Sequence, residues 1–155
     1  MKVEKDFEEF IRLLNAKKVE YLIVGAYAVA QYAEPRNTGD IDFLVHPTRK
    51  NASRIIEVLK AFGFAELKIS LRDLMDPEMV LQLGFAPVRI DLLTSLGDMN
   101  FNEMFEKRTI VKLGKTEASF ISLDDLIISK KIAGRPKDKA DLVVLRRMKK
   151  MMGRK

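Results

Sequence analysis

Two aspartates, Asp40 and Asp42, alternate with apolar residues at the start of a short hydrophobic run that ends at Val45. Successive side chains of a β-strand point to opposite faces, so the run predicts a strand with both carboxylates on one face. Ile41 and Phe43 would then point into a core on the other. Like charges on one face repel each other unless something positive lies between them. The pair therefore indicates a bound divalent cation, and the alternative is a strand that begins at a solvated sheet edge.

The composition limits which cation is expected. The chain has no Cys and one His among its 155 residues, which excludes disulfides, thiol catalysis and most metal sites built from His. Carboxylate oxygens are the ligands that Mg²⁺ and Mn²⁺ prefer. We therefore expect Mg²⁺ or Mn²⁺.

The chain's length predicts one domain over residues 1–155 with a sizeable core. No apolar run approaches the roughly 20 residues of a membrane-spanning helix, and the N-terminus is unlike a secretory signal, so a cytoplasmic protein is expected. Within a net charge of +6, residues 135–155 contain nine Lys or Arg against two Asp. This basic C-terminal segment, a helix and tail from about residue 136, either attracts nucleic acid or nucleotide phosphates or is a solvated helix end.

The segment before the two aspartates predicts a strand, a glycine and a helix. Tyr21–Val24 is apolar, Gly25 follows it, and Ala26–Tyr32 has the small residues of a helix that approaches another backbone closely. The start of such a helix leaves backbone N–H groups unpaired, which makes it a ready site for an anion. Turn residues over 34–39 then lead into Asp40.

Hydrophobic periodicity predicts the other elements. Helices are expected over residues 3–17, 47–62, 101–107, 122–133 and 137–151. Strands are expected in two hairpins, 79–83 with 88–94 and 109–111 with 118–121, and 64–69 is interpreted as a further strand. Residues 70–77 read as a connector, and the last helix offers Leu142, Val143, Leu145 and Met148 for packing. The pattern indicates an α+β fold with a central mixed sheet flanked by helices.

A third aspartate, Asp91, lies inside the apolar strand of residues 88–94. A carboxylate buried there needs a partner, because burying it alone is costly. Arg89, two residues earlier on the same face, is one candidate. A metal shared with Asp40 and Asp42 is the other, and the residues leave both open.

The spacing of these motifs resembles a known family. Val24-Gly25-Ala26 is followed, after thirteen residues, by Asp40-Ile41-Asp42-Phe43, with Asp91 on a later strand. This pattern is similar to that of the nucleotidyltransferase superfamily with the DNA polymerase beta-like fold, especially its small stand-alone prokaryotic members. Two further runs, Pro35 to Asp42 and Lys130 to Asp141, resemble a subgroup that includes toxin- and antitoxin-related nucleotidyltransferases. Together the matches extend over most of the chain.

The resemblance implies a nucleotidyltransferase-like fold and the transfer of a nucleoside monophosphate from an NTP to an acceptor hydroxyl, with release of pyrophosphate. The acceptor would be an RNA end or a side chain of a partner protein. Two metal ions are implied, both held by Asp40 and Asp42, with Asp91 holding one of them and accepting the hydroxyl proton. The implied nucleotide- and phosphate-binding residues are Gly25, Ala26, Arg36, Thr38 and Lys130.

Ala26 departs from the family pattern, which has Gly or Ser there. A hydroxyl that would touch phosphate is missing, whereas the backbone N–H remains, so weaker triphosphate binding is expected. His46 is interpreted as a packing or loop residue in preference to a ligand. For Arg36 and Lys130 the alternative is a solvated surface cation.

Two other functions are compatible with the sequence. The first is a non-catalytic nucleotide- or partner-binding module on the same fold, such as an antitoxin or adaptor. The second is a basic nucleic-acid-binding protein in which the acidic cluster is incidental, which predicts salt-dependent binding that survives loss of Asp40.

Overall fold

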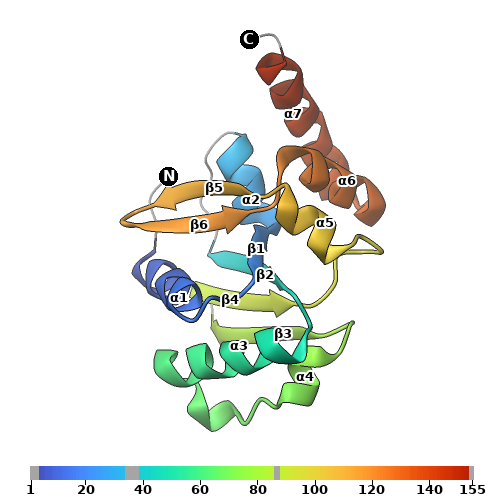
Figure 1. Ribbon diagram of the computed structural model, residues 1–155. Helices are drawn as coiled ribbons and strands as arrows, with labels where there is room; N and C mark the ends of the chain where they lie inside the picture. Colours follow the sequence, from blue (N-terminus) through green and yellow to red (C-terminus); the bar gives the residue numbers. More distant parts are fainter. Residues whose placement is uncertain (1–3, 34–38, 86–87, 154–155) are drawn as a thin grey trace.

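The computed structural model describes residues 4–33, 39–85 and 88–153 (Figure 1). Its strands form one six-stranded sheet in the order β3-β4-β2-β1-β6-β5. The strands are β1 (Tyr21–Val24), β2 (Asp40–Val45), β3 (Val80–Phe85), β4 (Val88–Leu93), β5 (Thr109–Leu113) and β6 (Thr116–Phe120). β2 pairs with β4 and β1 with β6 in parallel, whereas the other pairs are antiparallel. The predicted mixed sheet and both predicted hairpins are therefore confirmed.

The helices begin and end largely at the predicted capping residues. They are α1 (Lys5–Ala16), α2 (Gly25–Tyr32), α3 (Arg49–Phe62), α4 (Leu71–Met75), α5 (Phe101–Glu106), α6 (Leu123–Ala133) and α7 (Pro136–Met152), with a 3₁₀ turn η1 (Ala65–Leu67). Thr48 caps α3 by accepting a hydrogen bond from the Asn51 backbone N–H, and Ser122 caps α6 in the same way. Figure 1 shows α7 on the opposite side of the molecule from α3 and α4.

Helices α1 and α3 pack on the sheet and form part of the hydrophobic core, to which α2 and α4–α7 also contribute. Ile41 and Phe43 of β2 are fully buried, as predicted. The ring of Phe10 from α1 lies 5.4 Å from Phe43 and 5.1 Å from Phe62 of α3. Each fully buried large apolar side chain stabilises the fold by about 1.5–3 kcal/mol. Because this packing holds one face of β2 against the helices, Asp40 and Asp42 lie on the other face.

The interpretation of residues 64–69 as a strand was wrong. The segment forms the 3₁₀ turn η1, and Lys68 after it has a φ of +50°, in the left-handed region. Phe64 and Ile69 are partly buried against the core, whereas the four residues between them are exposed. A strand packed on one face would bury every second residue, and this segment does not.

Two other expectations need correction. The connector 70–77 contains α4, which begins at a reciprocal capping box between Ser70 and Asp73. In α7, Leu142 and Leu145 are buried, but Val143 is 59% exposed because it lies about 100° round the helix from Leu142.

His46 is a packing residue, as predicted. Its ring stacks on Phe101 at a centroid distance of 4.6 Å, and Nδ1 lies 3.1 Å from a carboxylate oxygen of Glu20. Separately, none of the helices within the described ranges has the length and apolar character needed to cross a membrane.

Candidate active site

Adjacent strands bring the three predicted aspartates to one face of the sheet. In the parallel register of β2 and β4, Asp42 lies opposite Asp91 and Asp40 lies opposite Arg89. Paired residues on neighbouring strands project to the same side. The result is a block of three carboxylates and one guanidinium, which we call the acid cluster: Asp40, Asp42, Arg89 and Asp91.

Gly25 lies directly against this cluster. It has a φ of +69° at the first position of α2, where β1 ends. A Cβ at this position would overlap Oδ2 of Asp42 and lie 3.2 Å from its Cγ. Glycine is therefore required at this position for two reasons: the backbone has a positive φ, and the Asp42 carboxylate occupies the space that a side chain would need.

Asp42 is protonated more readily than an ordinary aspartate. Burial, followed by the charge of Asp91 and a hydrogen bond with it, raises the pKa of Asp42 to about 6. Asp40 contributes further repulsion, and Arg89 only partly offsets these effects. Asp42 and Asp91 are thus two neighbouring carboxyl groups whose charges repel each other.

Arg89 connects the outer carboxylates of the cluster. Its Nη2 lies 3.1 Å from Oδ2 of Asp40 and 3.3 Å from Oδ2 of Asp91. Its Nε lies 3.3 Å from Oδ1 of Asp91. Of the two partners that the sequence left open for Asp91, Arg89 is in contact with it. Asp40 and Asp42, which would share a metal with Asp91, lie on the neighbouring strand β2.

The donor set of the cluster suits a hard divalent cation. All its acceptors are carboxylate oxygens, and the buried Oδ1 of Asp91 has no hydrogen-bond partner among the described residues. The pKa of Asp42 is raised first by burial and then by the charge of Asp91, and a cation bound beside these carboxylates would favour their ionised forms. Within 4–33, 39–85 and 88–153, no three acidic or His side chains are already grouped around one point as a metal site. A bound ion would therefore require Asp40, Asp42 and Asp91 to move closer around one point, and Arg89 contacts Asp40 and Asp91 here.

Two of the five predicted phosphate-binding residues, Gly25 and Ala26, lie beside the acid cluster. Gly25 and Ala26 form the first turn of α2, and no side chain caps that end of the helix. The backbone donors that the sequence predicted are thus placed beside Asp42. Arg36 and Thr38 lie outside the described residues.

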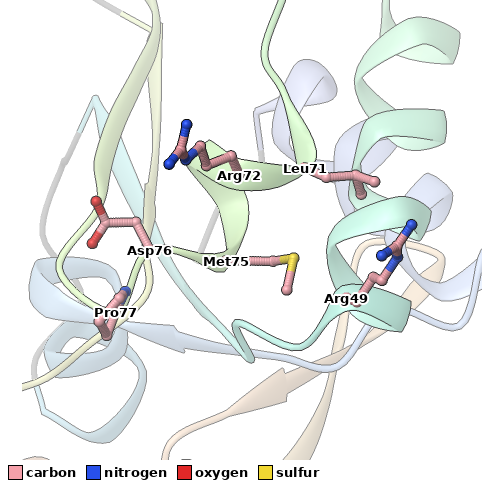
Figure 2. Close-up of a pocket in the computed structure, with 6 residues that line it drawn as sticks. All are labelled: Arg49, Leu71, Arg72, Met75, Asp76 and Pro77. Carbon is pink, nitrogen blue, oxygen red and sulfur yellow. The ribbon is translucent and has the colours of Figure 1, made fainter.

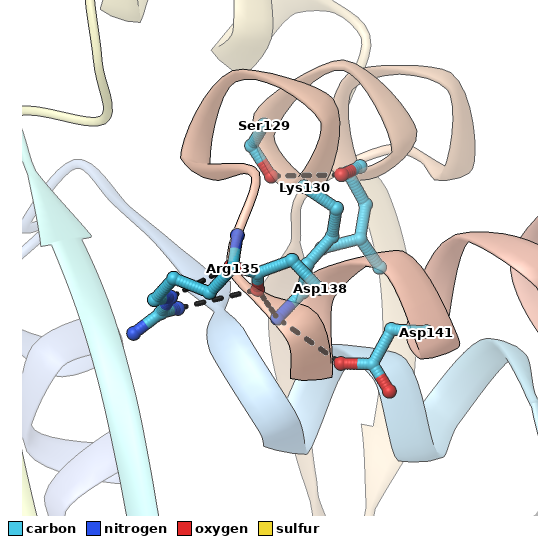
Figure 3. A network of polar contacts seen from close by, with 6 residues as sticks. Ser129, Lys130, Arg135, Asp138 and Asp141 are labelled. Atoms are coloured by element: carbon cyan, nitrogen blue, oxygen red, sulfur yellow. Dashed lines mark hydrogen bonds and ion pairs between the residues drawn. The ribbon is translucent and has the colours of Figure 1, made fainter.

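Lys130 lies in a buried ion-pair network between α6 and α7 (Figure 3). Its Nζ is 3.2 Å from Oδ1 of Asp138 and 3.3 Å from Oδ2 of Asp141. Arg135 also binds Asp138, with Nε 2.6 Å from Oδ2. A hydrogen bond from Arg135, together with the Lys130 contact, lowers the pKa of Asp138 to about 2. Among the described residues Lys130 has no contact with the acid cluster, so the structure does not bring it together with the three aspartates.

A separate hollow of about 580 Å³ lies between α3 and α4 (Figure 2). It is lined by Arg49, Leu71, Arg72, Met75, Asp76 and Pro77. The main-chain oxygen of Asp76 accepts a hydrogen bond from Thr94, just beyond the C-terminal end of β4, whereas Asp40 pairs near its N-terminal end. Figure 2 shows the guanidinium groups of Arg49 and Arg72 on opposite sides of the hollow, so they do not converge on one ligand.

A family model matches residues 3–155, which is nearly the whole chain. The family is described as "Nucleotidyl transferase of unknown function (DUF2204)". The chain belongs to this family. It is thus an enzyme of the nucleotidyltransferase class, as its motifs implied. No curated protein sequence matches it.

Solved structures of nucleotidyltransferases share the fold. The lincosamide antibiotic adenylyltransferase LnuA, with lincomycin bound, superposes with a TM-score of 0.59 at 15% identity, covering 95% of this chain and 98% of LnuA. A putative nucleotidyltransferase from Thermotoga maritima, TM1012, gives 0.57 at 16% identity, covering 96% and 91%. An antigenic nucleotidyltransferase-like protein from Paracoccidioides brasiliensis gives 0.52 at 14% identity, covering 90% and 74%. At these identities the likeness establishes the fold.

The sequence interpretation missed that Arg89 joins two of the aspartates. The alternation Arg89-Ile90-Asp91 placed it beside Asp91, but its contact with Asp40 depends on the pairing of β4 with β2. That pairing crosses 49 positions of the sequence and has no local signal.

Proposed function

We propose that this nucleotidyltransferase is metal-dependent and moves a nucleoside monophosphate from an NTP to a hydroxyl of an RNA end or a protein side chain, releasing pyrophosphate. The main observation behind the proposal is that Asp42 lies against Gly25 on one side and is paired with Asp91 on the other. A phosphate-binding helix start and two coupled carboxylates then lie within one small region. Nucleotidyl transfer needs this combination, because its catalysis is mainly positioning and neutralisation of charge.

The residues of the cluster have distinct tasks in this reaction. Asp40, Asp42 and Asp91 would hold Mg²⁺ or Mn²⁺, which neutralises phosphate charge when bound. The backbone N–H groups of Gly25 and Ala26 bind the triphosphate at the start of α2. Arg36 and Thr38 remain proposed phosphate contacts on the basis of the sequence pattern, and so does Lys130.

The bond changes follow from this placement. The acceptor oxygen forms a bond to the α-phosphorus, and the bond from that phosphorus to the β-phosphate oxygen breaks. Pyrophosphate leaves with those electrons. Asp91 would accept the hydroxyl proton at Oδ1, which is buried and accepts no hydrogen bond within the described part of the chain.

The choice of acceptor rests on charge and on size. The nine Lys or Arg of residues 135–155 favour an RNA end. LnuA, whose name states an antibiotic substrate, is covered over 98% of its length by this chain, so a protein of this size and fold can act on a small molecule. A small hydroxylated acceptor therefore belongs in the same experiment.

The test is transfer of label from each α-³²P-labelled NTP, with Mg²⁺ or Mn²⁺, to total RNA, to cell protein and to lincomycin. We expect one acceptor class to be labelled, and labelling to fall about a hundredfold or more in Asp42→Asn. Asp98→Asn is the matched control, because Asp98 is exposed and lies outside the cluster. Labelling that is equal in wild type and Asp42→Asn would contradict the proposal.

A non-catalytic binding module is the alternative on the same fold. It predicts that NTP binds without transfer to any acceptor. The side-by-side placement of Asp42 and Asp91 argues against it, because their mutual repulsion is a cost that a binding module has no need to bear.

A further inference from the structure

The Arg89 guanidinium occupies the space between the two outer carboxylates of the acid cluster. Nη2 contacts both Asp40, at 3.1 Å, and Asp91, at 3.3 Å. Arg89 thus links Asp40 of β2 with Asp91 of β4, which are not directly paired. Asp42 is the residue paired with Asp91. The guanidinium of Arg89 is thus the positive charge that these carboxylates contact, which is the role a shared metal ion would have.

The contact of Arg89 with Asp91 is close but imperfect. Nε of Arg89 and Oδ1 of Asp91 are 3.3 Å apart, yet both atoms are buried without a well-formed hydrogen bond among the described residues. The Arg89 side chain is also 34% exposed. Such an interaction can be exchanged for a better one at low cost, because neither atom gives up a full hydrogen bond.

Holding β2 to β4 does not require this ion pair. The two strands already pair over five consecutive positions, from Asp40 with Arg89 to Leu44 with Leu93. Ion pairs as exposed as Arg89 with Asp40 contribute little to stability. Arg89 therefore contributes little to stability. Because its charge lies among the candidate metal ligands, it acts mainly on the electrostatics of the site.

We propose that Arg89 is a positioning residue that holds Asp40 and Asp91 in place before the divalent ion binds, and that competes with this ion for them. The inference rests on the proposed metal-dependent function and deepens it. A bound ion would compete with Arg89 for these carboxylates, so Arg89 would lower the affinity for the free ion. By its contacts with Asp40 and Asp91 it would also limit how far the two side chains can turn.

The test measures Mn²⁺ binding by electron paramagnetic resonance, without nucleotide or acceptor, so it does not depend on activity. Arg89→Gln removes the competing charge, and we expect Mn²⁺ to bind more tightly by on the order of tenfold. Arg72→Gln is the matched control: it removes an exposed arginine of α4, outside the cluster, and should leave binding unchanged.

Arg89→Lys separates charge from geometry. Lysine keeps the positive charge but lacks the planar fork that reaches two carboxylates. We expect Mn²⁺ affinity within about twofold of wild type. In the transfer assay we expect kcat to fall in both variants, less in Arg89→Lys, with KM for the NTP unchanged.

The outcomes distinguish this inference from the proposed function. Mn²⁺ affinity that is equal in wild type and a folded Arg89→Gln overturns the role of Arg89 and leaves metal dependence intact. No Mn²⁺ binding by either protein overturns both. If Arg89→Gln does not fold, Arg89→Lys is the deciding variant. A kcat equal to that of wild type would show that the contact of Arg89 with both Asp40 and Asp91 does not position these carboxylates, and would overturn the inference.

Discussion

Gly25 has a φ of +69° and leaves just enough room for the carboxylate of Asp42. Gly25→Ala should therefore do more than strain the backbone. We expect a loss of about 1–2 kcal/mol in the free energy of unfolding from the left-handed conformation. We also expect weaker Mn²⁺ binding, because the new methyl group must displace Asp42.

Gly63→Ala is the control for that variant. Gly63 also has a positive φ, +101°, but a Cβ there meets nothing within 4 Å. Urea denaturation should show a loss of stability in both variants, with Mn²⁺ binding weakened only in Gly25→Ala. Equal Mn²⁺ affinities in the two variants would contradict the close packing of Gly25 on Asp42.

The pKa of Asp42 predicts a characteristic dependence of stability on pH. Burial and the neighbouring Asp91 raise this pKa to about 6 in the folded protein, against 3.8 for an ordinary Asp. Between these values the folded state binds more protons than the unfolded state, so the contribution of Asp42 to stability falls as pH rises. Without divalent ions, the stability of wild type minus that of Asp42→Asn should be lower at pH 7 than at pH 4.5.

Urea denaturation at the two pH values measures this difference. Addition of Mg²⁺ should reduce the loss at pH 7, because a bound cation favours the ionised carboxylates. A difference that grows with rising pH would show that Asp42 ionises easily in the folded state.

At the scale of elements, the pairing of α6 with α7 depends on Lys130. Its Nζ binds Asp138 and Asp141, and Asp138 is fully buried. Lys130→Met leaves these carboxylates without that cation, which we expect to cost about 3 kcal/mol of stability. Lys131→Met, one position along on the exposed side of α6, should change stability by less than about 0.5 kcal/mol.

The same pair of variants tests the proposed phosphate contact of Lys130. A structural role alone predicts a lower melting temperature with an unchanged KM for the NTP. A KM that rises in Lys130→Met, measured at a temperature where the variant is folded, would support a phosphate contact.

At the scale of the whole molecule, positive charge is concentrated in α7, across the molecule from α3 and α4 (Figure 1). If the acceptor is RNA, replacing Arg146, Arg147 and Lys150 by Gln should lower the slope of log affinity against log salt by about two, at about 0.7 per charge on a single strand. All three residues are exposed.

Filter binding of RNA at several salt concentrations measures this slope. Replacing three exposed lysines of α1, the turn after it and α3 (Lys5, Lys17 and Lys60) is the control with the same change of charge. An equal effect of the two triple variants would indicate attraction by net charge rather than binding along α7.

The elements with strong local signals were predictable from the sequence. Glycine, capping residues and alternating hydrophobicity act within a few positions, which is why β2, its inward-facing Ile41 and Phe43, and the capped ends of α3 and α6 were found. The segment 64–69 was misread because only Phe64 and Ile69 pack against the core while Leu67 is exposed, which is a property of the folded surroundings.

Asp40 and Asp42 were placed on one face by the two-residue period of a strand, so their proximity followed from local geometry alone. The meeting of Asp42 with Asp91, the contact of Asp42 with Gly25 and the bridge from Arg89 to Asp40 all depend on which strands lie side by side. That order arises from packing of the whole chain around one core. Tertiary structure therefore turned a pair of acidic residues into a cluster of three carboxylates with an arginine among them.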